Sequence, residues 1–262
     1  MTTSNATTPV TWSVDDKGIA TIRLNRPERL NALNLQVKRL IEAAIGEFES
    51  NNKVRVIIIK GENSVFVAGT DIAEMRDMTS STHGVEKTDQ VFHALRNCKK
   101  PLIAAVEKFA LGGGFELALA CDLIVADKNT RFAQPEIRVG IMPGAGGTQI
   151  LLRTIGKYRA MKMILTGEQI DTDQAMEMGL ISEVAETGKA YERAYQLAET
   201  ISKMPPLAVA AIKDVVKSGQ DMSLTSALLN EREAFVTLFD SEDQVEGMQA
   251  FMEKRAPSYK GK

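Results

Sequence analysis

Two glutamates lie beside glycine-rich segments in this chain of 262 residues. Glu116 follows the glycine run at residues 112–114, and Glu136 precedes a second glycine-rich loop at residues 143–148. Glycines let backbone N–H groups approach a ligand closely, and a helix that begins there directs its positive end toward an anion. A carboxyl group beside such donors can move a proton while the donors stabilise developing negative charge. The spacing therefore predicts a polar site that forms an enolate with the help of two carboxylic residues.

Each of these features also has a purely structural interpretation. The glycine run could allow tight packing between a strand and a helix, and the loop at residues 143–148 could be only a helix entry. Glu116 could be a carboxylate stabilised by a helix dipole, and Glu136 a surface charge. We expect Asp71 to cap the helix that follows it. One site is favoured because all of these features occur together, in one order along the chain.

The composition is that of an ordinary globular protein, with 44% hydrophobic and 25% charged residues. The formal net charge of -2 provides no basic field for nucleic acid and no polybasic patch for a membrane. An anionic ligand would therefore have to be bound by local donors. The length suits one large α/β domain or two small ones.

Cysteine and histidine are scarce, which excludes several kinds of site. Cys98 and Cys121 have no zinc-binding spacing and indicate a reducing compartment rather than a disulfide framework. His83 and His93 lie in a polar stretch, where we expect them on the surface. A Ser-His-Asp site and a His-rich metal site are therefore not expected, and no metal is predicted.

No targeting or membrane segment is expected. Residues 1–9 are rich in Thr and Ser and lack the apolar core of a signal peptide. The longest apolar run, residues 117–126, is short and contains Asp122. We therefore expect a cytoplasmic protein.

Hydrophobic periodicity predicts an α/β fold in which strands alternate with helices. The expected strands are a hairpin at residues 11–14 and 19–24, followed by buried strands at residues 54–59, 101–106 and 123–126. One expected helix begins near residue 34, and others cover residues 81–97, 190–203 and 224–239.

Several segments form an ordered set of motifs along nearly the whole chain. They are Arg26-Pro27-Glu28-Arg29-Leu30-Asn31-Ala32-Leu33, Phe66-Val67-Ala68-Gly69-Thr70-Asp71-Ile72, Ala110-Leu111-Gly112-Gly113-Gly114-Phe115-Glu116, Phe132-Ala133-Gln134-Pro135-Glu136 and Gly140-Ile141-Met142-Pro143-Gly144-Ala145-Gly146-Gly147-Thr148. This set resembles the crotonase, or enoyl-CoA hydratase/isomerase, family. The resemblance implies a layered β-β-α spiral core in residues 1–195. It also implies a helical segment at residues 196–262 that covers CoA and joins subunits.

The resemblance also implies an activity, the reversible addition of water to a 2-enoyl-CoA thioester to give a 3-hydroxyacyl-CoA. By match of motif, the amides of Ala68 and Gly113 would hold the thioester oxygen. Glu116 would activate water, Glu136 would exchange the proton at C2, and the amide of Gly144 would help to place the water. No cofactor is implied beyond the coenzyme A of the substrate.

Substrate contacts and assembly follow from the same resemblance. The acyl end would be lined by Met75, Met78 and Phe92, and the subunits would form a homotrimer or a dimer of trimers. Phe251 and Lys254 match positions that reach the CoA of a neighbouring subunit. The implied CoA-binding residues are Arg29, Ala32, Leu33, Ala68, Thr70, Asp71, Ile72, Phe251 and Lys254.

Alternative functions stay open at this point. A specialised acyl-CoA dehydratase or an enoyl-CoA isomerase would share the fold, although both glutamates favour water addition or removal. A non-catalytic CoA-binding or RNA-binding protein is a different class. Two departures from the family pattern are Thr70, where alanine is more usual, and Glu107-Lys108, which replaces a common Asn-Gly pair.

Overall fold

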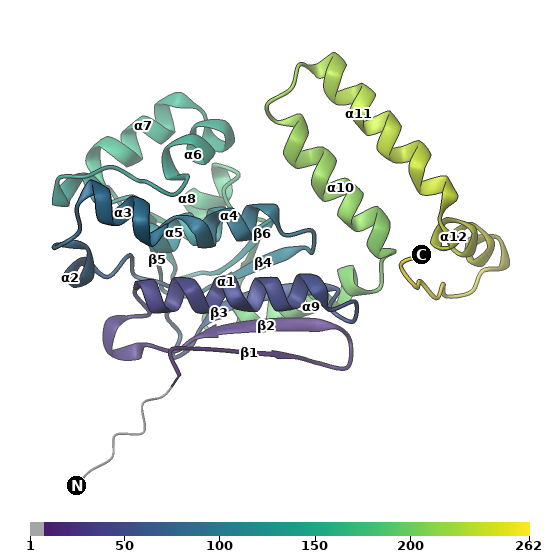
Figure 1. Ribbon diagram of the computed structural model, residues 1–262, viewed down its shortest axis with the longest axis horizontal. Coiled ribbons are helices and arrows are strands. Elements are labelled where there is room, and N and C mark those ends of the chain that lie inside the picture. The colour runs from purple at the N-terminus through teal and green to yellow at the C-terminus, as the bar shows by residue number, and fades with distance from the viewer. Residues whose placement is uncertain (1–7) are drawn as a thin grey trace, which may run out of the picture.

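A six-stranded sheet forms the centre of the computed structural model, which describes residues 8–262 (Figure 1). Its strand order is β1-β2-β3-β4-β6-β9; β1 is antiparallel to β2, and the other neighbours are parallel. This confirms the predicted α/β class and the predicted hairpin. The strands are β1 (Val10–Val14), β2 (Ile19–Leu24), β3 (Val56–Gly61), β4 (Leu102–Val106), β6 (Leu123–Asp127) and β9 (Glu183–Ala185).

Both faces of the sheet are buried, which explains the unbroken apolar run in β3. Successive side chains of a strand point to opposite faces. Ile57 and Ile59 accordingly join the larger hydrophobic cluster, whereas Val56 and Ile58 join a smaller cluster on the other face. A parallel strand covered on both sides needs apolar residues at every position.

Different helices cover the two faces. Helix α1 (Leu35–Ser50), capped by the Asn34 side chain, packs against α4 (Gln90–Asn97) on the face of the larger cluster. Helix α9 (Ala190–Ser202) lies on the other face and buries Ala190, Ala194 and Ala198 there. These small residues let the helix approach the sheet closely.

A second sheet of three short strands, which the sequence analysis did not predict, holds the glycine run. It consists of β5 (Phe109–Leu111), β7 (Arg131–Ala133) and β8 (Ile170–Asp171). Helix α5 (Gly113–Leu119) begins two residues after β5 ends. Lys108, in the unusual Glu107-Lys108 pair, takes a left-handed conformation with φ of 62° just before β5.

The remaining helices of the core surround the ends of the strands. The expected helix at residues 81–97 is instead two helices, α3 (Ser80–Glu86) and α4, because Lys87 adopts a left-handed conformation between them. The others are α2 (Ile72–Met75), α6 (Gly147–Ile155), α7 (Lys157–Thr166), α8 (Thr172–Glu177) and the short 3-10 helices η1 (Pro27–Arg29) and η2 (Glu136–Val139).

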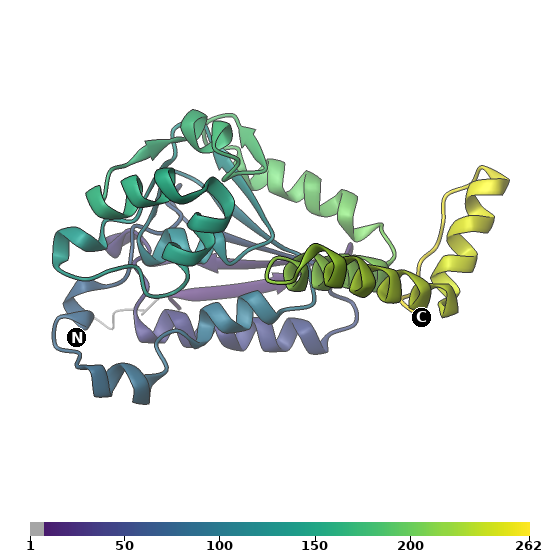
Figure 2. The ribbon, with the colours of Figure 1, turned by 90° about the horizontal axis from the view of Figure 1, so that it is seen from above.

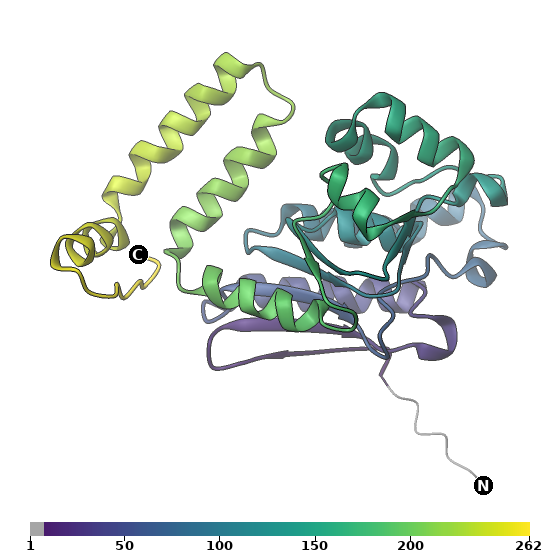
Figure 3. The same ribbon diagram turned by 180° about the vertical axis from the view of Figure 1, so that it is seen from behind.

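The C-terminal helices stand away from the sheet, as Figures 2 and 3 show. They are α10 (Pro206–Gly219), α11 (Leu224–Thr237), η3 (Leu238–Asp240) and α12 (Glu242–Glu253). The predicted division between residues 195 and 196 falls inside α9, which stays on the sheet through its buried alanines. The core therefore continues to Ser202, and the projecting segment begins at α10.

The prediction that the chain has no signal peptide rests mostly on residues 1–7, which lie outside the described residues. Within residues 8–262, none of the helices has the length and apolar character needed to cross a bilayer.

Candidate active site

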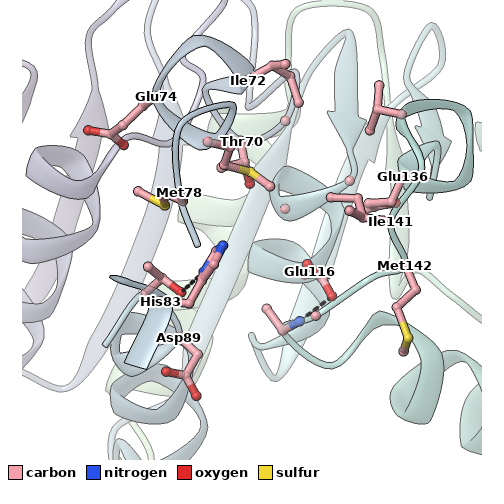
Figure 4. Close-up of a pocket in the computed structure, with 18 of the residues that line it drawn as sticks. Thr70, Ile72, Glu74, Met78, His83, Asp89, Glu116, Glu136, Ile141 and Met142 are labelled. Atoms are coloured by element: carbon pink, nitrogen blue, oxygen red, sulfur yellow. Dashed lines mark hydrogen bonds between the residues drawn. The ribbon is translucent and has the colours of Figure 1, made fainter. Parts of the chain in front are cut away.

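A cavity of about 690 Å³ brings most of the predicted site residues together (Figure 4). Its walls come from α1, α2 and the loop that precedes it, α3, α4, the start of α5, η2 and the loop before α6. The predicted acyl-lining residues Met75, Met78 and Phe92 all contribute to its surface. The predicted catalytic or CoA-binding residues that line it are Ala68, Thr70, Ile72, Gly113, Glu116, Glu136 and Gly144.

Only glycine fits at the run that begins α5. Gly112 has φ of 51°, a conformation that disfavours other residues. A β-carbon on Gly113 would lie 2.4 Å from Oγ1 of Thr70, and one on Gly114 would lie 2.3 Å from the carbonyl oxygen of Val67. The run therefore brings the start of α5 against the loop that contains Thr70.

Glu116 is buried and held by backbone amides. Its side chain is on α5, and the residue is 4% exposed. Oε1 accepts hydrogen bonds from the amides of Ala145 at 2.7 Å and Gly147 at 2.9 Å. These two donors fix the position of Oε1. Oε2 accepts no hydrogen bond within residues 8–262, so it can serve a reacting molecule.

Glu136 lies at the first position of η2, on the same side of the cavity as Glu116 in Figure 4, and is only partly buried. Burial raises the pKa of Glu136 to about 7; its backbone hydrogen bond opposes the shift, and the nearby Glu116 adds to it. The side-chain amide of Gln134, oriented by its hydrogen bonds, donates to the two Glu136 oxygens at 2.9 and 3.1 Å. These donors favour the ionised carboxylate, whereas burial favours the protonated form, so that Glu136 can hold a proton near neutral pH.

The structure supports only one of the two amides that were expected to hold the thioester oxygen. The amide of Ala68 donates to the carbonyl oxygen of Leu30 at 3.1 Å, so it is already engaged. The amides of Gly113 and Thr70 donate to no acceptor within residues 8–262. A β-carbon built on Gly113 would lie 3.6 Å from the Thr70 nitrogen, which places the two amides side by side. The free pair of donors is thus Thr70 and Gly113, and the assignment of Ala68 was wrong.

The amide of Gly144 also donates to no acceptor within residues 8–262, and Gly144 lines the cavity. The amides from the same loop that bind Glu116 are those of Ala145 and Gly147. Gly147 is buried, and a β-carbon there would lie 2.6 Å from the Gln134 side chain. The loop therefore supports Glu116 and the Gln134 contact to Glu136 at the same time.

The proposed CoA-binding loop at residues 26–33 lies beside the cavity, but several of its predicted contacts are structural. Asp71 does not cap α2; its carboxylate pairs with Arg26 at 3.1 Å. Leu33 is fully buried, and its backbone bonds Gly69 and Asp71. Ala32 accepts a hydrogen bond from Arg26 at 2.7 Å. Arg29 is exposed and does not line the cavity.

Phe251 and Lys254 are not brought to the cavity within one chain. Phe251 is 85% exposed on α12, and Lys254 is the left-handed residue that ends that helix. Both lie on the projecting C-terminal segment (Figure 2). A contact between them and a ligand in this cavity would require another subunit.

Sequence reasoning missed several polar residues of the cavity. His83 was expected on the surface; it is exposed, but it also lines the cavity with Glu74 and Asp89. Lys38 lines it from α1. Helical spacing could have indicated Lys38, because it lies three residues after the cavity residue Leu35 and therefore on the same face of the helix. Within the described chain, no group of three or more metal-binding side chains occurs.

Comparison with known proteins identifies the family. The family model described as enoyl-CoA hydratase/isomerase matches residues 15–262. A 2,3-dehydroadipyl-CoA hydratase of Escherichia coli is 42% identical over 245 residues, which cover 92% of this chain and 94% of that protein. A short-chain-enoyl-CoA hydratase of Clostridium acetobutylicum is 40% identical over 241 residues, which cover 90% of this chain and 92% of that protein.

Solved structures agree with the sequence relatives. An enoyl-CoA hydratase subunit of Geobacillus kaustophilus superposes with a TM-score of 0.93 at 41% identity, covering 97% of this chain and 98% of that one. An enoyl-CoA hydratase of Bacillus anthracis also reaches 0.93 at 33% identity, over 97% of this chain and 100% of that one. The crotonase-like fold and the hydro-lyase activity predicted from the sequence, that of an enoyl-CoA hydratase, are thereby confirmed. The chain belongs to the enoyl-CoA hydratase/isomerase family.

Proposed function

We propose that this chain adds water reversibly across the double bond of a 2-enoyl-CoA, with Glu116 and Glu136 sharing the proton transfers. The observation that carries this proposal is the placement of both carboxyl groups on one cavity, beside two free backbone donors. One carboxyl group is buried and held by two amides, whereas the other has a pKa of about 7. A pair with unlike environments can supply a base and an acid together.

The amides of Thr70 and Gly113 would hold the thioester oxygen. Addition to C3 makes this oxygen negative in the transition state, and donors that already point to it need no reorganisation. Loss of one such donor typically costs about 3 kcal/mol in transition-state stabilisation. The Thr70 side chain lies against Gly113 and so helps to define the width of this position.

The proton transfers would divide as follows. Oε2 of Glu116 takes a proton from water while the water oxygen forms its bond to C3. The electrons of the double bond move toward C2 and the thioester oxygen, and Glu136 delivers its proton to C2. Hydration then ends with Glu116 protonated and Glu136 ionised, and dehydration runs the same steps backward. The route requires no metal or redox cofactor, and coenzyme A takes part only as the carrier of the acyl group.

Assembly would complete the CoA site. Helices α10 and α11 contain no buried residue in the single chain. They expose large apolar side chains, including Ile212, Leu229 and Phe235, which are 63%, 68% and 48% exposed. Apolar faces of this kind are typical of subunit interfaces. We therefore propose a homotrimer or a dimer of trimers in the cytoplasm, in which Phe251 and Lys254 contact the CoA of a neighbour.

Loss of the enone absorbance of crotonyl-CoA tests the hydration chemistry. Purified wild-type protein should consume crotonyl-CoA and form 3-hydroxybutyryl-CoA, identified by mass as the addition of one water. In a separate assay with a 3-enoyl-CoA as substrate, formation of a product of unchanged mass would instead identify an isomerase. CoA binding without turnover of any enoyl-CoA would favour the non-catalytic alternative.

A further inference from the structure

The acyl end of the cavity carries more charge than a purely aliphatic substrate requires. Met75, Met78 and Phe92 share this end with Lys38 and His83. Figure 4 shows His83 beside Met78, on the wall opposite Glu136. A site selected only for alkyl chains would gain nothing from a half-buried ammonium group, since its partial desolvation is unfavourable.

Lys38 is the cation of this region, and its hydrogen bonding is incomplete. Its Nζ donates to the carbonyl oxygen of Thr88 at 3.0 Å and lies 5.8 Å from the centre of the Phe92 ring. An ammonium group has three donors. No carboxylate lies within 4 Å of this Nζ in the described part of the chain. Lys38 therefore keeps donors that a ligand could use.

Burial lowers the pKa of Lys38, because the charged ammonium group is less well solvated in this position than in water. The negative charges that oppose this effect belong to Glu116, Glu74 and Asp89. A further carboxylate brought within hydrogen-bond distance would favour the charged ammonium more strongly than these remote charges do.

The nearby acidic groups of this wall are committed to other partners. One oxygen of Glu74 accepts a hydrogen bond from the amide of Leu35 at 2.8 Å, at the start of α1. One oxygen of Asp89 lies 3.0 Å from Nε2 of His93. Nδ1 of His83 lies 3.0 Å from the Thr88 hydroxyl, so its other ring nitrogen is available to the cavity.

A second cavity of about 300 Å³ adjoins this end, because Leu35, Lys38 and Thr88 line both cavities. It is also lined by two more basic residues, Arg39 and Lys87. Arg39 pairs with Glu86, whereas no carboxylate lies within 4 Å of Lys87 among residues 8–262. The same cavity is lined by two carboxylates, Glu42 and Glu86, so three cations outnumber two anions in the space beside Lys38.

We propose that Lys38 binds a carboxylate at the far end of the acyl chain, so that the site favours CoA thioesters of dicarboxylic acids over those of plain fatty acids. This inference rests on the proposed function for the position of the thioester end. It adds a specificity-determining residue and a class of substrate. The second cavity gives room for the terminal group of longer members of that class.

Matched ligand pairs test the proposal by binding, independently of turnover. Adipyl-CoA and hexanoyl-CoA have six-carbon acyl groups and differ in the terminal carboxylate; suberyl-CoA and octanoyl-CoA form the eight-carbon pair. The dissociation constants are measured by calorimetry at pH 7 for wild type, Lys38→Met and Lys38→Arg. Lys53→Met, which changes an exposed lysine outside both cavities, is the matched control.

We expect Lys38→Met to lower the preference for the dicarboxylic member of at least one pair by about ten- to hundredfold, as for other hydrogen bonds between charged groups. Lys38→Arg should retain more of the preference, and Lys53→Met should retain all of it. An equal preference in wild type and Lys38→Met for both pairs would overturn the proposal. Hydration of trans-2-hexenoyl-CoA and trans-2-hexenedioyl-CoA is measured in parallel; failure of both would reject the hydratase mechanism, while the binding ratios would still decide the role of Lys38.

Discussion

The two glutamates of the cavity are held in different ways. Glu116 lies on α5 in the protein interior and accepts hydrogen bonds from two amides of the loop before α6. Glu136 lies on the short helix η2, whose four residues include none that is buried. Its partner is the side chain of Gln134, and its pKa is raised to about 7. One carboxyl group is thus fixed by backbone donors, and the other can stay protonated near neutral pH.

In the proposed mechanism the pair works with one shared proton. Hydration would start with the proton on Glu136, and dehydration would start with it on Glu116. Both directions would then require the same total number of protons on the pair. Variants that alter one glutamate or its partners at a time test this difference.

The largest effect is expected for Glu116→Gln. The amide side chain keeps an oxygen for the Ala145 and Gly147 donors but cannot take the proton of water. We expect kcat for crotonyl-CoA hydration to fall by at least about a hundredfold, and up to about ten-thousandfold. The circular dichroism spectrum and the thermal midpoint should remain close to those of wild type. A fall smaller than tenfold would exclude Glu116 as the base.

A loss of about a hundredfold or more is expected for Glu136→Gln, because the proton for C2 then has no donor of suitable pKa. The double variant should be little worse than the poorer single variant, since both groups act in one step. Steady-state kinetics of the three variants measures this. If the loss of kcat in the double variant equals the product of the losses in the two single variants, the two carboxyl groups act separately.

A smaller loss, of about ten- to hundredfold in kcat/KM, is expected for Gly113→Ala. The added methyl group would collide with Oγ1 of Thr70, which disturbs the two donors of the thioester oxygen. The second change Thr70→Ala removes that oxygen and should restore part of the loss. If the double variant is no better than Gly113→Ala alone, contact with Thr70 is not the cause.

The motifs allowed much of the site to be predicted, because residues close in sequence to a glycine run must also lie close to it in space. The start of α5 had to bring Gly113 and Glu116 to one place, whatever the details of the loops. The choice between Ala68 and Thr70 could not be made in this way. The chain turns at Gly69, where φ is 135°, and the direction of the next amide depends on that turn.

Other features depend on tertiary contacts that have no local signal. The small sheet consists of strands of two or three residues, too short for a clear alternation of polar and apolar side chains. The break between α3 and α4 occurs at Lys87, a residue with no intrinsic preference for the left-handed conformation. The predicted boundary at residues 195 and 196 missed that α9 belongs to the core, because only the tertiary structure shows that its alanines face the sheet.

The smallest effect is expected for Gln134→Met. Its amide donates to Glu136, and such donors favour the ionised carboxylate. Their removal should raise the pKa of Glu136 and move the alkaline decline of kcat/KM to higher pH, with a change in maximum rate below about fivefold. The pH profile of the variant checks this. A shift toward lower pH would mean that Gln134 does not stabilise the anion.

The pH dependence of kcat/KM for crotonyl-CoA hydration by the wild-type enzyme tests the shared proton most directly. In the proposed mechanism the pair is active with one proton, which Glu136 would lose as the pH rises through about 7. We therefore expect a bell-shaped profile whose alkaline limb has an apparent pKa near 7, with the same shape in the dehydration direction. A profile that stays flat from pH 6 to about 9 would contradict the assignment of the proton to Glu136.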